Sequence, residues 1–298
     1  MVRRSTMRMI KGRTVRHSIG DNIFSVTVYT ILILFAIGAL YPFAHVLAVS
    51  LSNETYVARG AISVIPKGLN MKAYIEVFNN DRILTGYKNT IYVTVLNVLF
   101  GVIITAMTAY PLSKKKLPGK TVITIFVCIT MWFQAGMIPQ FLVMKQLGLL
   151  NNLNGLVLAQ LTTGYNVIVM KNFFSGIPES LEESAKLDGA NDMQVLFKIV
   201  APLSKPILST VALWLAVSSW NNFFMPMLYL RDTERYTLQI FLREIVLNAS
   251  VNYEETGTGM TDMIRYATIM VATVPILMVY PFIQKYFVQG TMVGAVKE

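Results

Sequence analysis

Acidic and basic side chains gather in one part of this sequence, between residues 175 and 206. Apolar residues recur among them at helical spacing, while Pro178 suits a first helical turn and Gly189 suits a reversal between two short helices. The glutamates that follow Pro178 stand at the positive end of the first helix dipole. A two-helix segment with an apolar stripe and a charged rim is typical of a surface that docks onto another protein. Its titratable residues include Glu179, Glu182, Glu183, Lys186, Asp188, Asp192 and Lys198.

Residues for covalent or metal chemistry are few and scattered. The chain has two histidines, His17 and His45, and a single cysteine, Cys128, so that no internal disulfide can form. Gly119-Lys120-Thr121 matches the last three letters of the phosphate-binding pattern G-x-x-x-x-G-K-[ST], but Lys114 stands where the first glycine is required. We therefore expect no catalytic residue, no metal site and no ATPase site on this chain. Any ATP hydrolysis that drives its function must then occur on another chain.

Residues suited to sugar binding occur in two apolar stretches. Sugar sites combine aromatic faces with amide and hydroxyl groups. The same residue types also hold helices together in membrane bundles, so the sequence leaves both roles open. The candidates are Trp220, Asn221, Asn222 and Phe224 in one stretch and Tyr165 and Asn166 in another.

The composition requires a membrane to position these residues. Of 298 residues, 54% are hydrophobic and 14% are charged, whereas an average soluble domain has about 25% charged residues. Six stretches are long and apolar enough to cross about 30 Å of hydrocarbon. The sequence thus predicts an all-α integral membrane protein with six transmembrane helices. We place these spans at residues 25–51, 88–112, 121–139, 153–174, 207–230 and 263–287.

The distribution of charge orients these spans in a cytoplasmic membrane. The net charge of +10 comes mostly from a basic tail at 1–24 and from a lysine-rich turn after the second span. By the positive-inside rule both are cytoplasmic, and six spans then place both termini there, including a tail at 288–298. The loops 52–87 and 231–262 have mixed charge and are predicted outside. This pattern indicates membrane topology rather than nucleic-acid binding.

The span interiors argue against an ion-coupled carrier or a channel, which usually bury ionisable residues within the membrane. Here Arg265, near the outer end of the sixth span, is the main exception. This scarcity favours coupling to ATP over coupling to an ion gradient.

The 175–206 segment resembles the EAA loop of permease subunits of binding-protein-dependent ABC importers, written E-A-A, three residues, G, nine residues, I-x-L-P. The sequence departs from it at Ser184 and Ala201, which are small or apolar changes. In that family the loop forms two coupling helices that sit in a cleft of the ATPase subunit. The resemblance implies this role for Asp188 and for the matching positions, which are Glu183, Ala185, Gly189, Ile199 and Pro202.

The resemblance covers most of the chain. Within the family, the chain is similar to the carbohydrate-uptake branch, which includes the small permease of the maltose transporter. It implies a type I ABC importer permease architecture with a cytoplasmic two-helix coupling loop. Trp220-Asn221, with 236–239 and 243–245, resembles a subgroup that handles complex, often uronate-containing, oligosaccharides. Further matching stretches are Ala109-Tyr110, Ser113-Lys114, Pro118-Gly119-Lys120, Asp188-Gly189-Ala190, Pro202-Leu203-Ser204-Lys205-Pro206 and the ending from Lys285 to Lys297.

This resemblance also implies the partners. They are a homologous second permease subunit, two ATPase subunits, an extracytoplasmic sugar-binding protein and membrane lipid, with no nucleic acid. No cofactor is expected on this chain, because ATP and magnesium belong to the partner ATPase. The implied function is a multi-pass permease subunit that moves oligosaccharides inward across the cytoplasmic membrane.

Overall fold

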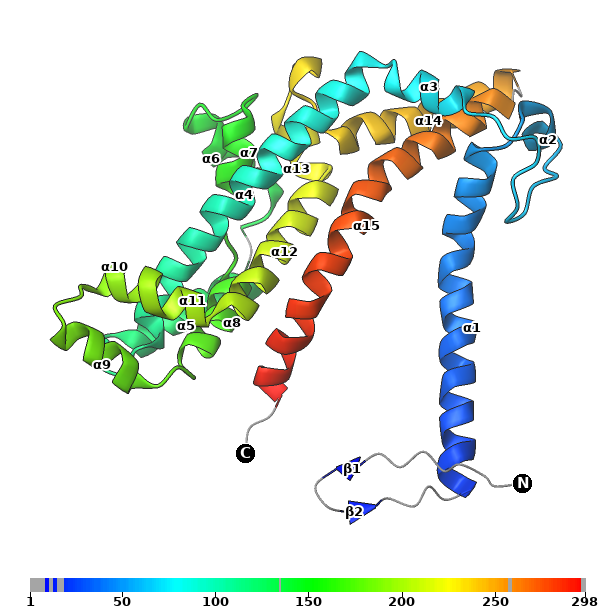
Figure 1. Ribbon diagram of the computed structural model, residues 1–298. Helices are drawn as coiled ribbons and strands as arrows, with labels where there is room; N and C mark the ends of the chain where they lie inside the picture. Colours follow the sequence, from blue (N-terminus) through cyan, green and yellow to red (C-terminus); the bar gives the residue numbers. More distant parts are fainter. Residues whose placement is uncertain (1–8, 11–12, 15–18, 134, 257–258, 296–298) are drawn as a thin grey trace.

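The computed structural model describes residues 9–10, 13–14, 19–133, 135–256 and 259–295 (Figure 1). Two short antiparallel strands, β1 (Met9–Ile10) and β2 (Arg13–Thr14), pair in the tail. The remaining elements of the described chain are helices. This agrees with the predicted all-α membrane fold.

Three long helices contain the predicted first, second and sixth spans. They are α1 (Ile19–Ser50), α4 (Asp81–Ser113) and α15 (Gly259–Ala295). Each contains a stretch apolar enough to cross a membrane. The helix α15 continues to Ala295, so residues 288–295 of the predicted tail are helical.

The third and fourth predicted spans are present as broken spans, each formed by two helices. The chain bends by 112° between α5 (Lys120–Trp132) and α6 (Met137–Gln146) and by 56° between α7 (Leu153–Ala159) and α8 (Gly164–Phe174). Gly136 has a φ of +78°, which a helix does not allow. The Thr163 side chain caps the start of α8 by accepting from the Asn166 N–H, which fixes a new helix start.

The fifth predicted span, 207–230, is also divided. The helix α12 (Lys205–Asn221) ends at Asn222, whose backbone is extended, and α13 (Phe224–Tyr229) follows. The Asn222 Oδ1 accepts a hydrogen bond from the Met225 N–H at 3.2 Å, which favours a restart over continuation. The stretch predicted as the fifth span is therefore formed by two helices rather than one.

The two predicted outside loops contain helices. In 52–87 these are α2 (Glu54–Ala58), α3 (Lys72–Phe78) and the first turns of α4. In 231–262 they are the 3₁₀ turn η2 (Thr233–Arg235), α14 (Leu238–Thr256) and the start of α15. Most of 231–262 is therefore helix rather than loop. The apolar side chains of Leu238, Ile240 and Phe241 are buried, and that burial stabilises α14.

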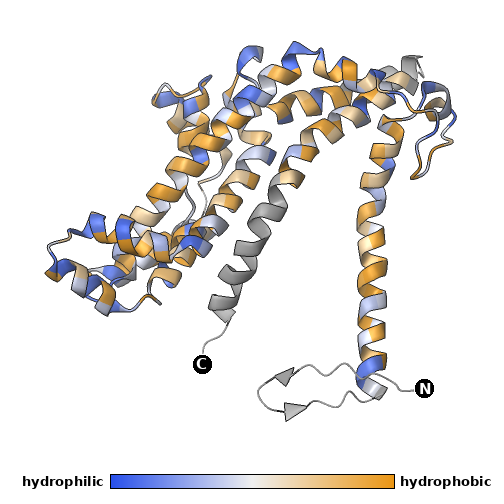
Figure 2. Cartoon of the chain, viewed as in Figure 1, coloured by the Kyte–Doolittle hydropathy of each residue, from blue (hydrophilic) through white to orange (hydrophobic). Residues whose placement is uncertain are grey.

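The helix α4 is the centre of the bundle and packs against α7, α8, α12 and α14. The main core lies where α4, α8 and α12 meet the 175–206 segment. By contrast, α1 stands apart from the bundle for most of its length and meets α15 near one end (Figure 1). Figure 2 shows that α1 is apolar along most of its length. None of its most apolar window is buried within the chain.

The 175–206 segment folds as two helical parts at the end of the bundle where α4 ends (Figure 1). The first is α9 (Glu179–Leu187). The second is continuous through α10 (Asp192–Val195), the π-helical turn η1 (Leu196–Val200) and α11 (Ala201–Leu203). An 88° bend then leads into α12. The two predicted helices are present, with Pro178 one residue before the first.

Gly101 allows the close packing at the centre of the bundle. A Cβ atom there would lie 2.4 Å from the Leu161 carbonyl oxygen and 2.8 Å from the Leu215 Cδ1. We expect Gly101→Val to destabilise the chain by about 1–3 kcal/mol through overpacking. The measurement is the thermal unfolding midpoint in detergent. Gly38→Val on α1 is the control, because no atom lies within 4 Å of its Cβ position; equal midpoints would contradict the close contact.

Candidate functional site

The first helix of the 175–206 segment ends in a glycine turn. Gly189 has a φ of +86°, a conformation that residues with a side chain rarely adopt. Its N–H donates to the Lys186 carbonyl at 3.1 Å, and the Ala190 N–H donates to the Ala185 carbonyl at 2.9 Å. These two bonds form a Schellman motif. No atom lies within 4 Å of a Cβ placed on Gly189, so the backbone angle, and not crowding, requires glycine.

The second helix begins with a capping box. The Asn191 side chain accepts from the Gln194 N–H, and the Gln194 side chain accepts from the Asn191 N–H, both at 2.9 Å. Ile199 is half-buried in the π turn, and Pro202 lies exposed just after it. The Ala201 N–H donates to the Leu196 carbonyl, five residues back, which is the hydrogen bond of a π-helix. The next residue, Pro202, has no N–H to donate.

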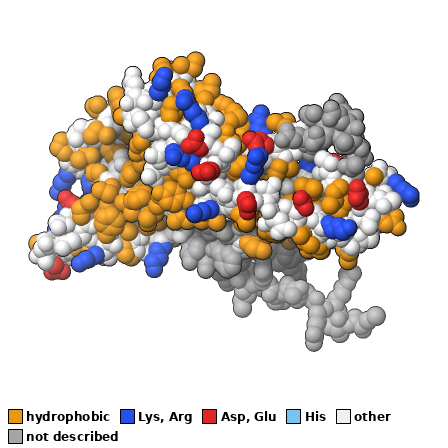
Figure 3. All heavy atoms as spheres, turned by 90° about the horizontal axis from the view of Figure 1, so that it is seen from above, with side chains coloured by type: hydrophobic (Ala, Val, Ile, Leu, Met, Phe, Trp, Pro, Cys, Tyr) orange, Lys and Arg blue, Asp and Glu red, His pale blue; other side chains and the backbone are white. Residues whose placement is uncertain are grey.

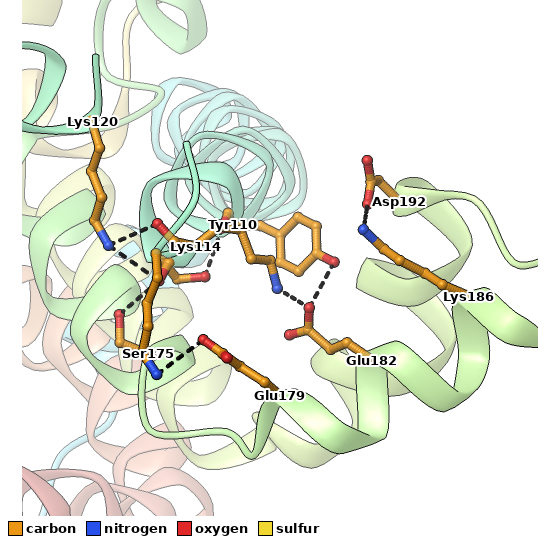
Figure 4. Close-up of polar contacts among 10 residues, drawn as sticks. Tyr110, Lys114, Lys120, Ser175, Glu179, Glu182, Lys186 and Asp192 are labelled. Carbon is orange, nitrogen blue, oxygen red and sulfur yellow. Dashed lines mark hydrogen bonds and ion pairs between the residues drawn. The ribbon is translucent and has the colours of Figure 1, made fainter. Parts of the chain in front are cut away.

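A buried ion pair joins α9 to the end of α4 (Figure 4). The Glu182 carboxylate contacts the Lys114 Nζ and accepts a hydrogen bond from the Tyr110 hydroxyl at 3.3 Å. The Lys114 Nζ also lies 3.8 Å from the centre of the Tyr110 ring. The Glu182 side chain is 12% exposed and the Lys114 side chain 28%. A carboxylate this buried requires a paired cation, so this contact fixes where α9 lies.

Further bonds hold the last carbonyls of α4. The Lys120 Nζ donates to the Lys114 carbonyl at 2.9 Å and to the Ser113 carbonyl at 3.3 Å. The Ser175 Oγ donates to the same Ser113 carbonyl at 3.4 Å, which ties the start of the 175–206 segment to α4 (Figure 4). A lysine at the negative end of a helix dipole is favourable.

The helix α9 also takes part in two ion pairs that are exposed to solvent. The Lys115 Nζ lies 3.2 Å from Glu179, and the Lys186 Nζ lies 2.7 Å from Asp192 on α10. The hydrogen bond to Asp192 raises the pKa of Lys186. The stabilisation from that pair is therefore present at neutral pH and is lost only as the pH rises through the raised pKa. Exposed pairs of this kind contribute about 0–1 kcal/mol each.

The outer surface of the segment is apolar with a charged rim. Leu187 is 89% exposed, and Glu183 and Asp188 are exposed beside it. Within the described chain, the Glu183 side chain has no hydrogen-bond or ion-pair partner. Ala185, in contrast, is half-buried and packs on the core. The other exposed apolar side chains are Leu181, Met193, Phe197 and Leu203.

Glu183 was predicted as a coupling residue, whereas the contact made by its neighbour Glu182 was not predicted. The signal was present as periodicity, because Glu179, Glu182 and Lys186 share one face of α9 at spacings of three and four. The partner charges lie about seventy residues earlier, at Lys114 and Lys115. A single sequence does not show which distant charge meets which.

The candidate substrate residues do not gather in one place. The Trp220 Nε1 donates to the Ala272 carbonyl at 3.3 Å, and its ring packs edge-on against Tyr87. Asn222 is occupied by the cap of α13 and by a hydrogen bond from its Nδ2 to Gln160 at 2.9 Å. These contacts hold helices together. A role in binding substrate remains a prediction for both residues.

The other four candidates lie in three settings. Asn221 lines a cavity of about 580 Å³ between α12, α14 and α15, whereas Phe224 lines a different cavity of about 710 Å³ beside α6. On α8, Tyr165 is exposed with its ring 5.3 Å from that of Trp214, and Asn166 is buried. In the part of the chain that the structure describes, no three His, Cys, Asp or Glu residues are placed to hold a metal ion.

Comparison with known proteins identifies the family. Residues 83–293 match the family described as "binding-protein-dependent transport system inner membrane component". The chain belongs to this family. It is thus an inner membrane component of an ABC transporter, as predicted, and the match includes α4, the 175–206 segment and most of α15.

Relatives of this permease include proteins named for sugar transport. The polygalacturonan/rhamnogalacturonan transport system permease protein YtcP of Bacillus subtilis (strain 168) is 40% identical over 283 residues, which are 93% of this chain and 99% of the relative. The arabinooligosaccharides transport system permease protein AraQ of Halalkalibacterium halodurans is 27% identical over 264 residues, 87% of this chain and 91% of the relative.

A solved structure confirms the predicted permease fold. One chain of a bacterial ABC transporter involved in the import of the acidic polysaccharide alginate superposes with a TM-score of 0.84. Its identity is 36%, and the match covers 92% of this chain and all of that chain.

The two neighbouring glutamates of this permease should differ in their effect on stability. Glu182→Gln leaves Lys114 as a half-buried cation without its carboxylate, and we expect a loss on the order of 3 kcal/mol. Glu183→Gln, which removes an exposed charge without a partner, is the matched control and should change stability by less than about 0.5 kcal/mol. Limited proteolysis of the purified chain, followed at the 175–206 segment, is the measurement. Equal cleavage rates in both variants would contradict the ion pair.

Proposed function

We propose that the chain is the permease subunit of an ATP-driven ABC importer, which moves oligosaccharides from an extracytoplasmic binding protein across the cytoplasmic membrane. The family, together with relatives named for transport of polygalacturonan, rhamnogalacturonan and arabinooligosaccharides, supports sugar import. An acidic substrate is supported by the alginate transporter, which is 36% identical, and by the polygalacturonan relative, which is 40% identical. Galacturonan and alginate are both polymers of uronic acids.

Energy comes from two separate ATPase subunits, which bind ATP and magnesium. The observation that carries this proposal is the outer surface of the 175–206 segment, where Leu187 is almost fully exposed beside the Glu183 carboxylate, which has no partner among the described residues. An exposed apolar cluster with a charged rim is suited to burial in a partner. Among the residues of the resemblance, Glu183 and Asp188 contact the ATPase, whereas Ala185, Gly189, Ile199 and Pro202 shape the segment.

Movement of the ATPases then reaches the membrane through two connections. The pair between Glu182 and Lys114 joins α9 to α4, and the helical run from α10 to α11 leads at 88° into α12. Because α4 and α12 pack against each other, displacement of the segment shifts both helices together. Such lever-like transfer between packed helices is a known form of conformational switching.

The arrangement of the helix ends supports cytoplasmic termini. The start of α1 and the end of α15 lie on the same side of the molecule as α9, opposite α3 and α14 (Figure 1). Seen from the α14 side, acidic and basic side chains are interspersed, as an outer face without a positive excess should be (Figure 3). This face receives the sugar-binding protein.

A second, homologous permease covers part of the exposed apolar surface. The helix α1 has an apolar window with none of its residues buried, and α1 reaches away from the bundle (Figure 2). Lipid covers what the partner leaves exposed. The two permeases together enclose the substrate path, with Asn221 and Phe224 as its candidate lining on this chain.

Glu183→Lys tests the docking proposal. We expect this variant to insert in the membrane as the wild type does. The amount of ATPase that co-purifies with it should fall at least about tenfold, because the reversed charge lies at the docking surface. The measurement is affinity purification of the tagged chain from membranes, with quantification of ATPase and second permease. Glu76→Lys, on α3 at the opposite side, is the matched charge-reversal control. Unchanged ATPase recovery and uptake with Glu183→Lys would contradict the proposal.

A further inference from the structure

One cavity of this permease combines an arginine with amide groups. It has a volume of about 580 Å³ and lies between the end of α12, α14 and α15. The wall from α14 is formed by Gln239, Leu242, Arg243 and Val246, which share a helix face at spacings of three and four. Asn221 and Phe223, at the end of α12 and just after it, close a second side.

Of the described residues that line this cavity, Arg243 is the only charged one. Its guanidinium carbon lies 4.5 Å from the centre of the Phe223 ring, which supports the planar group on one face. Among the residues that the structure describes, no carboxylate forms an ion pair with Arg243. The N–H edge of the Arg243 guanidinium is therefore available to bind a carboxylate in the bidentate geometry that guanidinium groups favour.

The surrounding residues suit the rest of a sugar. The Asn221 Nδ2 donates to the Val217 carbonyl at 3.0 Å, which leaves its Oδ1 to accept from a hydroxyl group. Gln239 adds a second amide, and Leu242 and Ile269 add apolar surface for C–H groups. A smaller cavity of about 220 Å³ shares Phe223 and Arg243 with this one and contains Glu244, so Arg243 lies between the two spaces.

We infer that Arg243, supported by Phe223, binds the carboxylate of a uronate unit as the oligosaccharide passes this chain, with Asn221 and Gln239 binding its hydroxyl groups. This inference rests on the proposed function and makes Arg243 a specificity residue for acidic over neutral oligosaccharides. The residue lies on α14, in a segment that the sequence predicted to be a loop.

The test uses the complete importer in proteoliposomes, with second permease, ATPase and binding protein. The binding protein is preloaded with galacturonate or mannuronate tetramers, or with their methyl esters, which have the same length without the charge. We expect Arg243→Gln to lower uptake of the acidic tetramer at least about tenfold and to change uptake of the ester less than about twofold. Arg243→Lys should retain part of the acidic uptake, because it keeps the charge without the bidentate fork.

Arg231→Gln is the matched control, since it removes an exposed arginine from the same outer region and does not line the cavity. Equal losses for acid and ester with Arg243→Gln would overturn the inference, since Arg243 would then hold a partner subunit. Unchanged uptake of both would overturn it as well. If the wild-type importer takes up neither the acids nor the esters while it hydrolyses ATP, the proposed acidic-oligosaccharide function itself fails, and this inference with it.

Discussion

The contact between Glu182 and Lys114 is the interaction on which the rest of this permease depends. It joins the end of the central helix α4 to α9, and Tyr110 shields it on one side. Because the pair is mostly buried, separating its charges is costly, and α9 must follow α4 as one body. In the importer that we propose, docking at one end of the molecule and rearrangement of the bundle are therefore two parts of one movement.

A second constraint on this permease lies at the breaks between its helices. The turn at Gly189, the bend before α12 and the end of α12 at Asn222 are fixed by local hydrogen bonds rather than by a continuous helix. In a membrane such breaks are stable where neighbouring protein satisfies the freed backbone groups. The broken fifth span also forms one side of the cavity that contains Arg243, so the break and the candidate substrate site occur together.

Much of this architecture could be predicted from the sequence, because long apolar runs and a basic excess are strong signals in a membrane protein. The spans of α1, α4 and α15 and the turn at Gly189 follow from such local patterns. The breaks in the other spans could not be predicted, because side-chain caps such as Thr163 create them within runs that remain apolar. Contacts between distant charges, such as Lys114 with Glu182, depend on the tertiary fold and were missed for that reason.

Site-specific cross-linking is the sharpest test of whether the outer surface of α9 docks onto the ATPase. With Cys128 replaced by alanine, Leu187→Cys places one thiol on that surface, and Leu69→Cys places one on an exposed leucine at the opposite side. In the assembled importer, we expect a short thiol-to-amine cross-linker to join the Leu187→Cys chain to the ATPase and to leave the Leu69→Cys chain unattached. Absence of the ATPase adduct at position 187, or an equal adduct at position 69, would contradict it.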